Sequence, residues 1–246
     1  MALLLGCGGD EAPDRLVSAE GEGTSFTRAA AAPADAPAPV AARADATPAG
    51  RWLTARLRRP VLLRAAPRGR RLARLGTRTE FGSPRVLGVL RRRPGWLAVQ
   101  APELANGRVG WIPAASTRLG ATDVSVRLDR GRRRLSLRVA GRTVRAFPVA
   151  VGRPGSPTPL GRFSVTDKLL PTNPGSPYGC CALALTGHQT KLDPGWPGGD
   201  RLAVHGTPLP ETIGRAASLG CMRADEGDLR ALLRRVPLGA PLFVRA

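Results

Sequence analysis

The 246-residue chain has few of the residues that fill a large core or coordinate a metal. Aromatic residues make up 4% of it, with one tyrosine, four tryptophans, five phenylalanines and two histidines. Since aromatic side chains normally dominate large cores, this shortage favours small domains with short strands. No stretch reaches the eighteen or so consecutive apolar residues of a membrane-spanning helix, so the sequence predicts none.

Lysine is also scarce, and arginine supplies nearly all of the positive charge. Lys168 and Lys191 are the only lysines, and the formal net charge is +20. Residues 1–49 carry −4, residues 50–121 carry +14 and residues 122–246 carry +10. We therefore expect any anionic partner, either a cell-envelope polymer or a membrane surface, to contact residues 50–121. Nucleic acid is a weaker candidate because zinc-finger spacing, aromatic RNA-binding motifs and a recognition helix are all missing.

The N-terminal segment, residues 1–49, predicts an anchor followed by a tether. Leu4-Leu5-Gly6-Cys7 resembles a lipobox, which would place a lipid on Cys7. The basic region and most of the apolar region of a signal peptide are missing, so a truncated signal competes with a chance apolar start. We favour the truncated signal because an alanine- and proline-rich stretch too polar to fold follows it. A poorly translated extension without a role is the alternative.

Residues 50–118 predict a small antiparallel barrel, because short β-like runs alternate with turns. The runs are 61–64, 81–83, 86–90, 96–99 and 109–113. The Gly-Trp-Leu-Ala-Val run and the later Gly-Arg-Val-Gly-Trp-Ile-Pro run resemble bacterial SH3-like domains found beside cell-wall enzymes. We expect Trp96 and Trp111 to be core or groove residues, and residues 91–93, three arginines, to form a solvated turn or a wall or lipid contact.

Residues 122–246 predict a mainly β domain with one late helix. Apolar and polar residues alternate in 134–139 and again in 143–149, which predicts a hairpin with one buried face. Residues 225–235 place leucines at helical spacing and are the only clear helix.

The candidate chemistry lies in a cysteine that follows a histidine. A thiol attacks a carbonyl only as the thiolate, so it needs a base beside it. Only His188 and His205 could supply an imidazole, and Cys221 follows the second of them by sixteen residues. Prolines and a glycine lie between, which predicts a loop that brings the two together. Gly220 allows close backbone approach to a substrate, and neighbouring amides could hold an oxyanion.

The sequence His205-Gly206-Thr207, followed by Ser218-Leu219-Gly220-Cys221-Met222-Arg223, resembles the signature of the L,D-transpeptidase (YkuD-type) catalytic domain. In that family an HG(T/S) strand precedes an S-x-G-C-x-(R/N) loop. Further agreement with the family is found in residues 150–152, 158–163, 177–179, 186–188 and 235–241. The resemblance therefore covers residues 122–246 and implies that they form a β-sandwich catalytic domain.

The resemblance implies a thiol enzyme of the cell envelope, outside the cytoplasm, that needs no cofactor. Cys221 would attack a peptidoglycan stem peptide with His205 as base, release D-alanine and leave a thioester. An amine of a second stem would then form a 3→3 cross-link, whereas water would give an L,D-carboxypeptidase. We expect oxyanion contacts from the backbone of Gly220, Cys221 and Gly206. The expected substrate-binding residues are Arg223, Ser218, Tyr178 and His188, with Ser218 supporting the loop.

Two positions depart from the commonest family pattern. Leu219 stands where histidine is frequent, and Gly206 stands where some members have serine, so that a backbone carbonyl would have to orient His205. The competing hypotheses are an inert buried Cys221, a zinc site that includes the adjacent Cys180 and Cys181, and a degenerate domain that only binds an envelope polymer. Pairing of Cys180 or Cys181 with Cys221 in an oxidising compartment would abolish activity.

Overall fold

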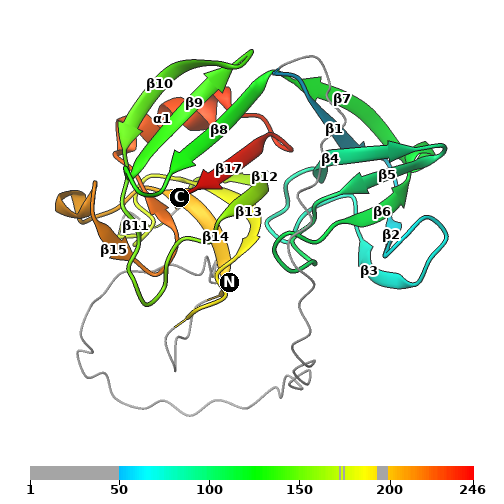
Figure 1. Ribbon diagram of the computed structural model, residues 1–246, viewed down its shortest axis with the longest axis horizontal. Helices are drawn as coiled ribbons and strands as arrows, with labels where there is room; N and C mark the ends of the chain where they lie inside the picture. The colour runs from blue at the N-terminus through cyan, green and yellow to red at the C-terminus, as the bar shows by residue number, and fades with distance from the viewer. Residues whose placement is uncertain (1–49, 172, 174, 193–198) are drawn as a thin grey trace, which may run out of the picture.

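The computed structural model describes residues 50–171, 173, 175–192 and 199–246, and it is mainly β. Figure 1 shows two sheets side by side, one from each half of the described chain. The predicted lipobox and tether lie outside the described residues. Within the described part, no helix is both long enough and apolar enough to span a membrane.

The N-terminal β-sheet domain is a seven-stranded antiparallel sheet in the order β3-β2-β6-β5-β4-β1-β7. Its strands are β1 (Trp52–Leu57), β2 (Val61–Arg64), β3 (Arg71–Leu75), β4 (Val86–Arg93), β5 (Trp96–Val99), β6 (Gly110–Pro113) and β7 (Thr117–Thr122). Buried leucine, valine, isoleucine and alanine side chains fill its core. With so few aromatics, short strands curled around small side chains are what the composition favours.

One expected strand and one expected turn of this half are wrong. Residues 81–83 are not a strand but part of the loop between β3 and β4, and the half-buried Phe81 packs on the other sheet instead. Residues 91–93 are not a turn. They are the end of β4, with all three arginines exposed, because the hairpin turns only at Pro94 and Gly95. Because three charged residues follow one another there, the sequence shows no alternation of apolar and polar residues that would indicate a strand.

The second sheet has eight strands in the order β10-β9-β8-β17-β12-β13-β14-β16 and curls into a half-barrel. Its strands are β8 (Val124–Asp129), β9 (Arg134–Val139), β10 (Arg142–Pro148), β12 (Gly161–Leu169), β13 (Ala182–His188), β14 (Arg201–His205), β16 (Met222–Arg223) and β17 (Pro241–Arg245). The pairs β8–β17 and β14–β16 are parallel and the rest antiparallel. A short parallel pair, β11 (Val151–Gly152) with β15 (Ala216–Ser218), lies beside the sheet.

The predicted hairpin and helix of this half are both present. The hairpin is β9 with β10, and the helix is α1 (Glu226–Arg235). Asp225 caps α1 by accepting hydrogen bonds from the backbone N–H groups of Gly227 (2.8 Å) and Asp228 (3.3 Å), which satisfies donors that a helix start leaves unpaired. Its leucines at helical spacing pack into the same core as β8, β12, β13 and β17.

Candidate functional site

The fold brings His205 beside the cysteine loop. Strand β14 ends at His205, and β16 runs parallel to it with Val204 opposite Met222 and His205 opposite Arg223. The connecting segment folds back through a 3₁₀ turn at Pro210–Thr212 and through β15. The predicted loop thus brings His205 and the cysteine motif, sixteen residues apart in sequence, onto neighbouring paired strands. His205 and Cys221 are both fully buried.

The Cys221 sulfur lies over the backbone of β14. The N–H of Ala203 donates to Sγ at 3.3 Å, a contact that favours a thiolate over a thiol. Cys180 and Cys181 are both free thiols, so neither is paired with Cys221 in this structure. The cluster around the sulfur is apolar and includes Ala203.

His205 is held as a neutral imidazole. Its Nδ1 lies 2.6 Å from the carbonyl oxygen of Gly206, and since a carbonyl only accepts, Nδ1 carries the proton. Nε2 therefore has the lone pair, and this atom is buried without a hydrogen-bond partner among the described residues. Burial lowers the pKa of His205 to about 4, opposed by the Gly206 carbonyl and aided by the positive charge of Arg223. At neutral pH the ring can accept a proton.

The Tyr178 ring packs edge-on against His205, with ring centroids 5.2 Å apart and an interplanar angle of 80°. Tyr178 also packs on the apolar cluster that contains Cys221. This predicted substrate-binding residue therefore lies at the site, where it restricts the orientation of the imidazole.

The loop before Cys221 is held by hydrogen bonds between its own residues. The Ser218 hydroxyl donates to the carbonyl of Cys221 at 2.6 Å and accepts from the N–H of Gly220 at 3.1 Å. The N–H of Gly206 donates to the carbonyl of Cys181 at 3.2 Å. Two of the three backbone positions expected to face an oxyanion thus have their N–H groups bonded within the protein in this structure.

A second layer, which the sequence did not reveal, fixes the same loop from outside. The Gln189 side-chain amide donates to the carbonyl of Leu219 at 2.9 Å, and the Thr158 hydroxyl donates to the carbonyl of Gly220 at 2.8 Å. Gly220 has a φ of +121°, and a Cβ on it would lie 2.1 Å from the Gln189 amide nitrogen. Glycine is required there for both conformation and space.

Arg223 lies next to His205 on β16 and is 4% exposed. Its backbone pairs with Ala150 in both directions, with N–H to oxygen distances of 3.1 and 2.8 Å. This pairing joins residues 150–152, which agree with the family pattern, to the cysteine motif and holds the arginine at the site.

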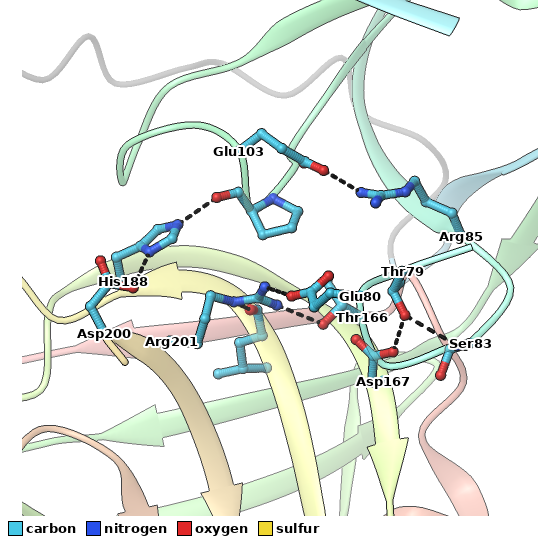
Figure 2. Close-up of polar contacts among 12 residues, drawn as sticks. Thr79, Glu80, Ser83, Arg85, Glu103, Thr166, Asp167, His188, Asp200 and Arg201 are labelled. Carbon is cyan, nitrogen blue, oxygen red and sulfur yellow. Dashed lines mark hydrogen bonds and ion pairs between the residues drawn. The ribbon is translucent and has the colours of Figure 1, made fainter. Parts of the chain in front are cut away.

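His188 lies at the contact between the two sheets, as Figure 2 shows. Its Nδ1 is 2.9 Å from a carboxylate oxygen of Asp200, and its Nε2 is 2.6 Å from the carbonyl oxygen of Pro102. Because a carboxylate and a carbonyl both accept, this arrangement favours the protonated ring, in which both nitrogens donate. The hydrogen bond with Asp200 is the main reason that the pKa of His188 is raised, against its partial burial. Both ring nitrogens of His188, the atoms that a substrate would bind, are thus hydrogen-bonded to protein groups.

Cys181 does not resemble a nucleophile. Cys181 is buried, and burial, together with the neighbouring Cys180, raises its pKa to about 12. Among the residues that the structure describes, no group of three or more histidine, cysteine or acidic side chains is arranged to hold a metal ion.

Comparisons with known proteins identify the family of the second half of the chain. Residues 123–244 match the family of L,D-transpeptidase catalytic domains, YkuD. The chain is 32% identical over 114 residues to "Putative L,D-transpeptidase YkuD" of Bacillus subtilis (strain 168), covering 46% of this chain and 61% of that one. A protein of the same name from Bacillus licheniformis is 34% identical over 112 residues, covering 46% of this chain and 59% of that one.

Among solved structures, L,D-transpeptidase 3 from Mycobacterium tuberculosis, in complex with a faropenem-derived adduct, is similar with 18% identity and a TM-score of 0.42. The match covers 56% of this chain and 73% of that one. The present chain spans about three fifths of the length of the two Bacillus proteins. Residues 123–244 belong to the YkuD family and form an L,D-transpeptidase catalytic domain.

Proposed function

We propose that this protein is a peptidoglycan L,D-transpeptidase with Cys221 as nucleophile and His205 as general base. The observation that carries the proposal is the state of His205. Its Nδ1–H is fixed on Gly206, and its unpartnered Nε2 lies on the strand that pairs with the cysteine loop. A buried basic nitrogen without a partner is costly in a folded protein, and accepting a thiol proton explains why it is retained.

The reaction proceeds in two displacements. His205 Nε2 takes the proton from Cys221, and the thiolate attacks the carbonyl carbon that links the diamino acid at stem position three to D-alanine. The tetrahedral intermediate collapses, the C–N bond breaks, and the departing amine of D-alanine takes the proton from His205. A thioester remains on Cys221. An amine of a second stem then gives its proton to His205 and attacks the thioester, which forms the 3→3 cross-link and releases the thiolate.

Two further groups assist the substrate. The backbone of the cysteine loop holds the developing oxyanion, and the N–H groups of Gly206 and Gly220 are bonded within the protein in this structure. Gly206 and Gly220 serve mainly to shape the loop. Arg223 binds a substrate carboxylate through its forked guanidinium and also keeps His205 neutral by its charge.

The alternative within the same active site is an L,D-carboxypeptidase, in which water resolves the thioester. Both reactions use the same nucleophile and base. Incubation of reduced protein with a stem tetrapeptide, followed by mass spectrometry, separates them. We expect D-alanine together with a cross-linked dimer, and no product from Cys221→Ala. D-alanine with tripeptide alone would identify the carboxypeptidase, and no turnover by a folded wild-type protein would contradict both.

The N-terminal β-sheet domain, which we propose to be SH3-like, would bind an anionic envelope polymer. In its register Arg91 is opposite Ala98, which is opposite Trp111, and Arg93 is opposite Trp96. Alternate residues of a strand share a face, so these side chains lie on one face, where the exposed arginines cover the buried Trp111. The guanidinium carbons of Arg93 and Arg91 lie 5.1 and 6.0 Å from the Trp111 ring centroid.

A hollow of about 380 Å³ continues this basic and aromatic face. It is lined by Arg59, Pro60, Val61, Leu62, Arg64, Trp96, Pro113 and Ser116. Arginines above tryptophan attract a polyanion and retain an apolar surface for its backbone. If the catalytic half were degenerate, this face would be the whole function, and loss of Cys221 would leave binding intact. Lipid attachment at Cys7 would place both halves at the outer face of the membrane.

A further inference from the structure

A small basic hollow, called the arginine hollow below, lies on the second sheet at the end away from Cys221. Its volume is about 190 Å³. Four arginines, one aspartate and two hydroxyl side chains line it, among them Arg127, Arg134, Ser136 and Arg138. The strands that carry these residues, β8, β9 and β10, are neighbours at one end of the sheet (Figure 1). The hollow lies outside residues 50–121, where the distribution of charge along the sequence favours anionic contacts.

The strand register puts the arginines of this hollow on the face of the sheet that points away from the core. Arg127 on β8 is opposite Ser136 on β9, and Arg134 and Arg138 lie two residues before and after Ser136. The residues that alternate with them are fully buried: Val126, Leu128, Leu135 and Leu137. Because side chains alternate between the two faces of a strand, the three arginines and Ser136 share the outer face.

The three arginines are close together and have few acceptors. Diagonal neighbours on paired strands are about 7–8 Å apart, so Arg127 is within reach of both Arg134 and Arg138. Arg127 forms no hydrogen bond or ion pair with any residue that the structure describes. Burial lowers the pKa of Arg127, and the charges of Arg245 and Arg138 add to this effect against Asp129. Like charges at this spacing repel one another, and a bound anion would relieve the repulsion.

The one carboxylate of the hollow is already engaged. Asp129 accepts from the backbone N–H of Arg132 at 2.8 Å and from Nη1 of the same residue at 2.9 Å. The Arg132 side chain stands at the rim, 83% exposed. Arg134 donates one N–H to the carbonyl of Ala146 at 3.1 Å. The charge of the remaining arginines is therefore left largely uncompensated by the protein.

Arg138 is oriented by the hairpin that it belongs to. Its Nη2 donates to the carbonyl of Gly141, in the turn between β9 and β10. Its Nε is buried without an acceptor in the described part of the chain. A carbonyl neutralises no charge, so Arg138 also keeps its positive charge, and the bond to Gly141 limits the rotamers that it must give up when it binds a ligand.

The size and the donors of the arginine hollow match a phosphate group. A volume of about 190 Å³ is below the roughly 300–1,000 Å³ of pockets for drug-sized ligands, so the hollow suits a single headgroup-sized anion. Guanidinium groups bind phosphate through paired, charge-assisted hydrogen bonds. The tetrahedral oxygens of a phosphate accept from several such groups at once, whereas a carboxylate offers only two oxygens in one plane.

We propose that Arg127, Arg134 and Arg138 form a binding site for a phosphate group, either free in solution or on a lipid headgroup, with the Ser136 hydroxyl donating between them. This site is independent of the proposed thiol chemistry. Five strand spacings separate β9 from β14, which is about 24 Å along the sheet. The bound phosphate therefore does not touch Cys221, and it gives the catalytic half an anionic contact of its own.

The test titrates inorganic phosphate into the full-length protein by calorimetry at low ionic strength. We expect Arg127→Gln to weaken binding about tenfold, because it removes a charged donor without breaking a hydrogen bond within the described protein. Arg134→Gln removes a second donor and should have a similar effect. Arg142→Gln, at an exposed position outside the hollow, is the matched control and should bind as the wild type does. Melting curves establish that each variant is folded.

Sedimentation with phosphatidylglycerol vesicles distinguishes the two sources of the phosphate. If Arg127→Gln weakens only vesicle binding, the ligand is a lipid headgroup. If it weakens only binding of inorganic phosphate, the ligand is free phosphate, and a loss of both shows that the site accepts either. Losses in Arg127→Gln and Arg134→Gln no larger than in Arg142→Gln would show general attraction to a basic protein and would overturn the inference. A wild-type protein that binds neither probe would also overturn it, whatever the variants do.

Discussion

The two halves of the molecule use their polar residues in opposite ways. In the described chain, twelve polar or charged side chains are buried in residues 125–223 and five in residues 54–116. Of those five, Thr79 and Gln100 bond to the second sheet. The N-terminal half instead carries most of its arginines on the outside, and its only two acidic residues, Glu80 and Glu103, are in ion pairs.

The second half buries polar groups that position other groups, whereas the N-terminal half exposes charges that can meet a partner. Buried polar groups are costly unless each is bonded, and in the second half they hold one loop and one imidazole in place. Exposed arginines cost little folding free energy, and their positive charge attracts anions over long distances. Substitutions should therefore affect the two halves through different measurements.

The largest effect is expected where the catalytic half is most constrained. Gly220→Ala forces a Cβ against the Gln189 amide and strains a backbone with positive φ. The rate of Cys221 acylation should fall by about a hundredfold or more. Gly214→Ala is the matched control, because its φ is +83° but nothing lies within 4 Å of its Cβ. Equal rates for the two variants would show that the loop is not held as described.

A smaller effect, confined to the other half, is expected from the basic face. Replacing Arg91 and Arg93 together by alanine should weaken binding of polyphosphate by about tenfold and flatten its salt dependence. Acylation of Cys221 should not change. Arg132 and Arg142, exposed on the second sheet, provide the control double variant. Binding that is insensitive to salt in the wild type would argue against a polyanion contact.

The smallest effect is expected at the contact between the halves. The pKa of His188 is raised above its ordinary value of 6.5, so its pairing with Asp200 stabilises the fold fully below that value. This stabilisation is lost as pH rises through the raised pKa. Since Asp200 is half exposed, we expect less than about 1 kcal/mol, or up to about 3 °C in Tm. In His188→Gln this part of the pH dependence should vanish, and its persistence would place the titration elsewhere.

The sequence alone predicted the parts that rest on local patterns. The alternation in the hairpin, the leucine spacing of α1 and the motif around Cys221 each lie within a short segment. They identified the mainly β fold, the catalytic domain and the residues that β14 and β16 bring together. The need for a backbone carbonyl to orient His205 also followed from glycine at position 206.

Contacts between distant segments were not predictable in this way. Thr79 and Asp167 are 88 residues apart, and neither lies in a recognisable motif. Phe81 was assigned to a strand because apolar residues indicate burial but not which surface buries them. The use of the Gly220 N–H by Ser218 depends on a hydroxyl rotamer that no spacing reveals.

The most direct test of the central claim is the intact mass of the reduced full-length protein after incubation with a carbapenem, which membership of residues 123–244 in the family predicts will acylate the thiol. The account predicts one adduct on the wild type, located at Cys221, and none on Cys221→Ala. If both proteins are folded and neither is modified, or if both are modified equally, Cys221 is not the nucleophile.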